Sequence, residues 1–151
     1  MVDVLTPEQR RRNMSRIKGK DTKPELVLRR GLHARGLRYR LHDRELPGRP
    51  DLVFPKYKTA LFVHGCFWHA HGCSLSKLPS TRQLFWSAKL AANGERDRRA
   101  IHELVSAGWH VLVVWECALR GPKRLGAEQV VEQCECSIRR PAPGLVEIAG
   151  T

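Results

Sequence analysis

The feature that most constrains the fold is a nearly unbroken apolar run, WHVLVVWE at positions 109–116. A strand this uniformly apolar is typical of the middle of a sheet that helices cover on both faces. Upstream, DLVF (51–54) and TALFVHG (59–65) read as two shorter strands, and the turn residues between them predict a hairpin. Residues 81–107 have helical spacing, with a possible break at Gly94, so strand, helix and strand predict a right-handed crossover.

Two further helices complete the expected fold. In DTKPELVLRRGLHARG (21–36), Thr22 and Glu25 fit the Thr-x-x-Glu capping box. GAEQVVEQCECSIRR (126–140) is amphipathic and predicts a final helix. Residues 141–151 look like a loose, flexible tail. The fold class is therefore α/β, with a small mixed β-sheet flanked by helices.

The charge of the chain points to a polyanion partner. The 27 Lys and Arg residues against 15 Asp and Glu residues give a formal net charge of +12, which suits nucleic acid. Residues 1–20 are basic and have little to bury, so we expect an arm that orders on its partner. No apolar segment is long enough to cross a membrane and none has the character of a signal core. We therefore expect a cytoplasmic protein without a membrane partner.

The chain has five cysteines, an odd number in a chain expected to be cytoplasmic. Metal ligands or free thiols are favoured over a disulfide framework in that compartment. The five are Cys66, Cys73, Cys117, Cys134 and Cys136. The last two lie two positions apart on the predicted final helix and point in different directions, so we assign them no role.

Histidine and cysteine are concentrated in ALFVHGCFWHAHGC, at positions 60–73. A structural zinc site needs four soft or borderline ligands in a tetrahedron. Cys66, Cys73 and Cys117, which follows the long apolar strand, would supply three of them. The spacing leaves open whether His69 or His71 is the fourth. It also leaves open that the cysteines are simply buried apolar side chains.

A carboxylate and a histidine mark the predicted hairpin as a candidate catalytic site. Asp51 stands at its start in the turn PGRPD, and His64 ends the second strand. Acidic and polar groups on neighbouring strands can hold Mg²⁺, which polarises a phosphodiester and activates water. Histidine can act as the general base near neutral pH. Taken singly, Asp51 could be a turn acid, His64 a core histidine, Glu25 a cap and Asp97 a surface ion-pair partner.

Two aromatic residues stand between the candidate ligands. Phe67 and Trp68 have neighbours that hold the loop near the surface, so they cannot easily withdraw into a core. Exposed aromatics beside basic residues favour stacking on bases or wedging between them. Trp86 is a candidate third member. Packing in the core or beneath a lid is the alternative for each.

Taken together, these motifs resemble a known family. NMSRI, LPGRPDLV, HGCFWH…C, STRQLFW, N…RDRR and GWHVLVVWECALRG are similar to motifs of the very-short-patch repair (Vsr) mismatch endonucleases over nearly all of residues 8–125. The resemblance implies a restriction-endonuclease-like fold with structural Zn²⁺ and Mg²⁺-dependent nicking of double-stranded DNA. The nick would fall 5′ of the thymine in a T:G mismatch, which arises when 5-methylcytosine deaminates. The domain plan is then a DNA-contacting arm (1–20), an endonuclease domain (21–140) and the tail (141–151).

The resemblance also implies partners and a working context. We expect a monomer that acts in the bacterial nucleoid. We also expect functional links to a cytosine-5 methyltransferase and to mismatch-repair proteins. Two alternatives remain: an endonuclease of the same fold that nicks with a different or relaxed mismatch preference, and a non-catalytic, zinc-stabilised DNA-binding module.

Roles for the catalytic residues follow from the resemblance. Asp51 would be the Mg²⁺-binding carboxylate, with the backbone carbonyl of Val63 as a further ligand. Family members often have threonine there, and valine keeps the carbonyl. His69 would be the general base, with His64 as its companion holding a metal-bound water. Glu25 would position water, and Asp97 would orient a catalytic histidine.

Binding roles follow in the same way. The resemblance assigns His71 to zinc, together with Cys66, Cys73 and Cys117, and leaves His69 for catalysis. The residues implied to touch DNA are the aromatic wedge Phe67, Trp68 and Trp86, the arm residue Met14, and Lys89 and Asn93 near the mismatched pair.

Overall fold

The computed structural model describes residues 22–69, 71–73, 75 and 78–151. The expected N-terminal arm, with Met14, therefore lies outside the described residues. A mixed five-stranded sheet with the order β1-β2-β3-β4-β5 forms the centre of the described chain. Its strands are β1 (Arg40–Leu41), β2 (Leu52–Phe54), β3 (Thr59–His64), β4 (His110–Trp115) and β5 (Gly144–Ile148). The α-helices of this part are α2 (Lys23–Ala34), α3 (Gln83–Ser106) and α4 (Ala127–Arg139).

The pairing of the strands confirms the hairpin and the central strand. β2 pairs antiparallel with β3, with Leu52 opposite Leu61, and β3 runs parallel to β4. All residues of β4 are buried, as the unbroken apolar run predicted. Two short 3₁₀ helices, Pro55–Tyr57 and Glu116–Ala118, follow β2 and β4. The last of these turns carries Cys117 to the end of the sheet where β3 also ends.

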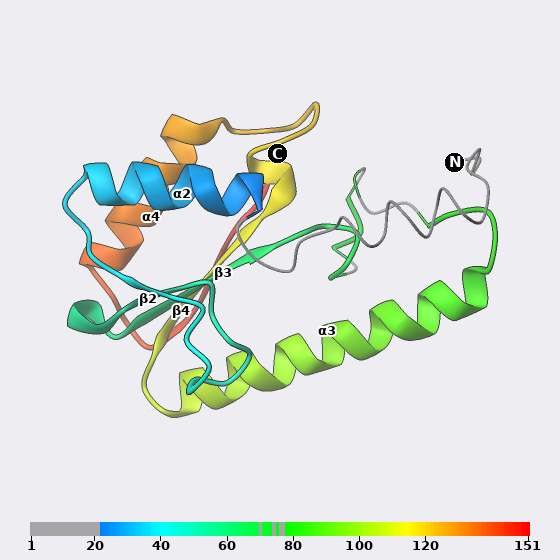
Figure 1. Ribbon diagram of the computed structural model, residues 1–151, viewed down its shortest axis with the longest axis horizontal. Coiled ribbons are helices and arrows are strands. Elements are labelled where there is room, and N and C mark those ends of the chain that lie inside the picture. The colour runs from blue at the N-terminus through cyan, green and yellow to red at the C-terminus, as the bar shows by residue number, and fades with distance from the viewer. Residues whose placement is uncertain (1–21, 70, 74, 76–77) are drawn as a thin grey trace.

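The sheet is covered on both faces. Figure 1 shows α2 and α4 on one side of the strands and the long α3 on the other. One core layer joins side chains of α2 and α4, such as Leu28 and Ile138, to inward residues of the strands such as Leu61. The other layer places Leu104 of α3 against the alternate strand residues, such as Val113. This alternation is what strands buried on both faces require.

Helix α2 begins as its cap predicted, but its capping box is only half formed. The Thr22 side chain accepts a hydrogen bond from the Glu25 amide at 3.4 Å. The Glu25 carboxylate does not complete the reciprocal half of the box, because it points inward and is only 1% exposed. Gly36, with φ of +88°, follows the helix and allows the chain to turn there. Glu25 therefore serves the helix through its backbone and leaves its side chain for other contacts.

Two details of the expected fold were wrong. Residues 141–151 are not a loose tail, because Gly144–Ile148 form β5, which pairs parallel with β4 from His110 to Val114. The free edge of β4 supplies hydrogen bonds that a sequence pattern does not reveal, and Ile148 is buried against the sheet. Helix α3 also runs unbroken through Gly94 for 24 residues. Glycine lowers helix stability without ending a helix whose other residues pack well.

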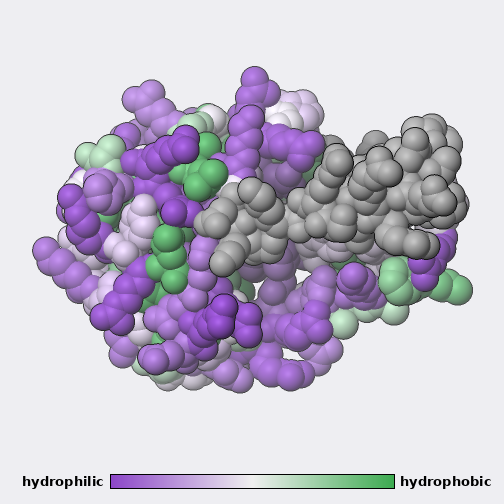
Figure 2. Space-filling model, viewed as in Figure 1, coloured by the Kyte–Doolittle hydropathy of each residue, from purple (hydrophilic) through white to green (hydrophobic). Residues whose placement is uncertain are grey.

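Two properties of the surface complete the description. Among the described residues, no helix combines the length and apolar character needed to cross a membrane. The face of the molecule in Figure 2 is mostly hydrophilic where residues are described, in keeping with the net charge of +12.

Candidate active site

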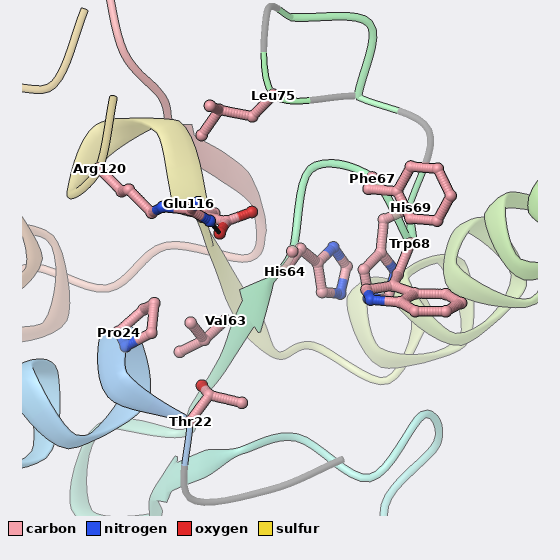
Figure 3. A pocket seen from close by; sticks show the side chains of 11 residues that line it. Thr22, Pro24, Val63, His64, Phe67, Trp68, His69, Leu75, Glu116 and Arg120 are labelled. Atoms are coloured by element: carbon pink, nitrogen blue, oxygen red, sulfur yellow. Dashed lines mark hydrogen bonds and ion pairs between the residues drawn. The ribbon is translucent and has the colours of Figure 1, made fainter. Parts of the chain in front are cut away.

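A cavity of about 550 Å³ opens at the carboxyl end of β3. Figure 3 shows Thr22 and Pro24, at the start of α2, on one side of it and the aromatic rings on the other, with His64 and His69 between them. Glu116 and Arg120 close a third side (Figure 3). A cavity where a strand ends, bordered by polar and aromatic groups, is a common setting for a binding site.

Cys66, His71, Cys73 and Cys117 meet beside this cavity. One ligand atom from each lies within 4.8 Å of all the others. His71 Nδ1 lies 3.6 Å from the sulfur of Cys66 and 3.6 Å from that of Cys117. Ligands at ordinary zinc bond lengths in a tetrahedron are about 3.5–3.8 Å apart. The donor set and its spacing therefore fit Zn²⁺.

The backbone supports these three sulfurs as thiolates. Each accepts a backbone N–H: Cys117 donates to Cys66 Sγ, Leu75 to Cys73 Sγ and Gly150 to Cys117 Sγ, at 3.3–3.4 Å. Burial raises the pKa of the Cys66 thiol, and the neighbouring cysteines add to the increase. A cation at the centre would reverse this effect, because a coordinating thiol loses its proton. His71 is held by stacking on Trp115, with ring centroids 4.1 Å apart.

A second cluster joins Glu25, His42 and Asp51, with one ligand atom of each within 4.8 Å of the others. Asp51 Oδ2 accepts the Val63 amide at 2.7 Å, which ties the carboxylate to β3. The pKa of Asp51 is raised to about 7, chiefly by burial and then by the nearby Glu25. Two carboxylates this close, one of them fully buried, share a site that a bound cation would stabilise. His42 was not singled out from the sequence, where it stands in an unremarkable LHD.

The Val63 carbonyl faces the same side of β3 as Asp51. The N–H and C=O of one strand residue point the same way, and the Val63 N–H points to Asp51. Extending the pairing of Leu52 with Leu61 by two residues brings Pro50 opposite Val63. Proline has no N–H, so it cannot satisfy that carbonyl in the ladder. The backbone thus leaves an oxygen acceptor next to the Asp51 carboxylate.

His64, His69 and Asp97 form a third cluster. The rings of His64 and His69 stack with centroids 3.8 Å apart and planes 5° from parallel. His69 Nδ1 lies 2.5 Å from Asp97 Oδ2. A carboxylate only accepts hydrogen bonds, so His69 Nδ1 carries the hydrogen and Nε2 is left as a base. Asp97 therefore holds the His69 ring in one orientation.

His64 differs from its stacked neighbour. Its side chain is buried, and within the described chain its Nδ1 has no hydrogen-bond partner. Burial, followed by repulsion from His69, lowers the pKa of His64 to about 3. A neutral ring with an unpaired buried nitrogen is suited to hydrogen bonding with a bound molecule or water.

The aromatic residues form one cluster beside the histidines. Phe67, Trp68 and Trp86 contact one another edge to face, with centroids 5.1–5.9 Å apart. Trp86 is only 7% exposed, so it lies beneath Phe67 and Trp68, which are half-buried. The sequence alone could not distinguish the buried Trp86 from the half-buried Phe67 and Trp68. It also missed Leu84 and Phe85 at the start of α3, which are 90% and 44% exposed.

Lys89 and Asn93 lie on the same stretch of α3 as Trp86. Lys89 Nζ is 5.6 Å from the ring centroids of both Trp68 and Trp86, within the range of a cation–π contact. Asn93 Nδ2 donates to the Trp68 carbonyl at 3.1 Å, and its Oδ1 accepts from Arg96. The surface beside the histidines therefore combines aromatic faces with positive charge, as surfaces that bind nucleic acids do.

A pair of adjacent carboxylates, an oriented histidine and a basic aromatic surface around one cavity define a class, the enzymes that hydrolyse a nucleic-acid backbone. Comparisons with known proteins agree. A family profile described as DNA mismatch endonuclease Vsr matches residues 2–75. DNA mismatch endonuclease Vsr of Escherichia coli (strain K12) is 48% identical over 135 residues, covering 89% of this chain and 86% of that protein.

Two relatives carry another description. The type II nicking enzyme V.XorIIP of Xanthomonas oryzae pv. oryzae is 50% identical over 119 residues, or 79% of this chain and 88% of that protein. The type II nicking enzyme V.HpaIIP of Haemophilus parainfluenzae is 40% identical over 139 residues, or 88% of this chain and 99% of that protein. The chain belongs to the Vsr family of DNA mismatch endonucleases, and it is a DNA endonuclease.

Proposed function

We propose that this endonuclease uses Mg²⁺ to nick one DNA strand on the 5′ side of the thymine in a T:G mismatch. The observation that carries the proposal is the hydrogen bond from the Val63 amide to the Asp51 carboxylate, next to a cavity that the aromatic cluster borders. The family supplies the endonuclease activity and the mismatch class of substrate. The same resemblance supports a restriction-endonuclease-like fold for the five-stranded sheet.

Both metals would be held by residues that fit them. Asp51 and the Val63 carbonyl offer the oxygen ligands that Mg²⁺ prefers. When bound, Mg²⁺ supplies electrostatic stabilisation of the phosphodiester and an acidified water. Cys66, His71, Cys73 and Cys117 would hold a structural Zn²⁺, because they form a closed set of four soft or borderline ligands.

The side chains divide the remaining work. His69 accepts the proton of the attacking water at Nε2 while Asp97 holds the hydrogen on Nδ1. His64, which is neutral, buried and stacked on the His69 ring, offers a hydrogen bond to a bound molecule or water. Glu25 positions water next to Asp51 from the start of α2. Only one strand is cut, because one such site acts on a duplex that binds in one orientation.

The aromatic cluster would recognise the mismatch. Phe67 and Trp68 enter the base stack, with Trp86 supporting them from below. Unstacking costs a few kcal/mol and costs least at a mismatched pair, so insertion itself favours damaged sites. Lys89 and Asn93 would then face the mismatched bases. Lys and Arg side chains contribute phosphate affinity that falls steeply as salt increases.

This assignment is tested by incubating the pure protein with Mg²⁺ and labelled duplexes that differ only at one base pair. We expect a nick 5′ of the thymine in the T:G duplex and little cutting of the T:A and C:G controls. Equal cutting of all three duplexes would contradict mismatch recognition. Varying the flanking bases in the same assay gives the sequence preference.

A second candidate is a nicking endonuclease of the same fold with a different or relaxed preference. It is favoured by the two relatives described as type II nicking enzymes, at 50% and 40% identity. A panel of all mismatches separates the two, because the second candidate cuts another mismatch at least as fast as T:G. Deamination of 5-methylcytosine as the source of T:G pairs supports the expected functional link to a cytosine-5 methyltransferase. We further expect the enzyme to act as a monomer and to work alongside mismatch-repair proteins.

A further inference from the structure

We propose that His42 is a positioning residue that holds the Glu25 carboxylate beside Asp51, so that the two acids act as one unit during strand cleavage. The inference deepens the proposed function and rests on it. The sequence pattern did not single out His42. Its role follows from the tertiary structure, where α2, the end of β1 and the start of β2 come together.

The side chain of His42 binds Glu25 through both carboxylate oxygens. Its Nε2 lies 3.2 Å from Oε1 and 3.0 Å from Oε2. Since an ionised carboxylate only accepts, Nε2 carries a hydrogen and donates it. Glu25 is 1% exposed, and a buried carboxylate without such partners is costly. Arg29 also reaches Glu25, but its Nη1 contacts Oε2 alone, at 3.3 Å.

The backbone of His42 binds the second acid. Its amide donates to the Asp51 carbonyl at 3.0 Å, which continues the pairing of β1 with β2 by one residue. His42 itself has φ of +48°, a left-handed conformation that few residues other than glycine adopt. Such strain is found where a side chain is needed in one direction, and here that direction is toward Glu25.

These contacts link Glu25 of α2 to Asp51 at the start of β2 through one residue. Without the His42 donor, the Glu25 carboxylate loses the partner that binds both of its oxygens, and Arg29, which contacts Oε2 alone, holds it less firmly beside Asp51. In the described part of the chain, neither the aromatic cluster nor the cysteine cluster hydrogen-bonds to His42, so DNA binding and zinc content should be unaffected. The expected loss is therefore confined to the cleavage step and its Mg²⁺ requirement.

The test compares His42→Leu with His42→Gln. Both replacements meet the same backbone conformation, but only glutamine can donate a hydrogen bond from near the position of Nε2. Single-turnover nicking of the T:G duplex is measured across a Mg²⁺ titration, with duplex affinity measured in the absence of Mg²⁺. The control is His102→Leu, an exposed position on α3, which should nick at the parental rate.

We expect His42→Leu to nick about 10- to 100-fold more slowly and to need more Mg²⁺, as is typical when a residue that supports metal ligands is removed. His42→Gln should recover most of that rate, and both variants should bind the duplex with parental affinity. A glutamine variant as slow as leucine, or a leucine variant at the parental rate, would overturn the proposal. So would a leucine variant whose duplex affinity falls as much as its rate. A parental protein that nicks no duplex would instead refute the proposed function.

Discussion

Two groups of candidate metal ligands lie near the carboxyl end of β3, and they are built in opposite ways. The cysteine cluster draws on two separate segments, the loop after β3 and the turn after β4, and each of its sulfurs accepts a backbone N–H. The acidic cluster of Glu25, His42 and Asp51 offers oxygen atoms next to the Val63 carbonyl, to which Pro50 cannot donate a hydrogen bond. A closed set of soft ligands suits a structural ion, and an incomplete set of hard ligands leaves coordination for water and substrate.

This difference indicates which cluster should stabilise the fold and which cluster should take part in the chemistry. Cys117 follows β4, so a metal in the first cluster ties the end of that strand to the loop after β3. The hydrogen bond that the Asp51 carboxylate accepts from the Val63 amide joins only neighbouring strands. Removing a ligand from each cluster should therefore give opposite results.

The largest effect is expected from Asp51→Asn, which keeps the shape of the side chain and removes its charge. Losing several kcal/mol of metal-assisted stabilisation of the transition state should lower the nicking rate about 1000-fold or more. Zinc content and duplex affinity should stay at parental values. Single-turnover nicking, metal analysis and a binding titration check the three quantities, and a variant that nicks like the parent would show that the active site is elsewhere.

The second prediction tests the cysteine cluster with Cys117→Ser, which removes one candidate zinc ligand. Zinc binding supplies roughly 10–16 kcal/mol to small zinc domains, and losing even a third of that contribution would lower the Tm by about 10 °C or more. The matched control is Cys136→Ser, because Cys136 is exposed on α4 and outside the cluster. We expect one zinc per chain in the parent and in Cys136→Ser, but not in Cys117→Ser. Equal zinc content and equal Tm in the two variants would refute the structural role.

The smallest effect is expected at the histidine pair between the two clusters, with Asp97→Asn. Asparagine can still contact His69 but no longer stabilises the protonated ring, so the nicking rate should fall about 10- to 100-fold. Zinc content and Tm should not change, because neither Asp97 nor His69 belongs to the cysteine cluster. A change in Tm without a change in rate would assign the pair to stability instead. The rate is measured at saturating Mg²⁺ so that metal affinity does not contribute.

Local pattern was sufficient for most of the fold. The apolar run at 109–116 predicted a buried central strand, and β4 is one because every residue faces a covered surface. The capping residues at 22–25 predicted the start of α2. β5 was not predicted from the sequence. Leu145 and Val146 are exposed in the structure, so this strand lacks the buried apolar face by which strands are recognised. Its stability comes from backbone hydrogen bonds to β4, which have no sequence signature.

The candidate site was predictable in its chemistry and less so in its arrangement. Spacing alone could not choose between His69 and His71 as the partner of the cysteines. In the structure His71 faces two sulfurs and His69 faces Asp97. Trp86 illustrates the same limit, because only packing shows that it lies under Phe67 and Trp68.

The sequence by itself determined which kinds of side chain are present and how they are spaced along the chain. It therefore determined the α/β class, the basic character and the set of candidate ligands. Only the tertiary structure decided which of these groups meet. Glu25, His42 and Asp51 are separated along the chain, and their approach depends on α2 packing against the sheet and on the register of β1 with β2. Side-chain chemistry is a local property, whereas proximity between distant residues is produced by the folding of the whole domain.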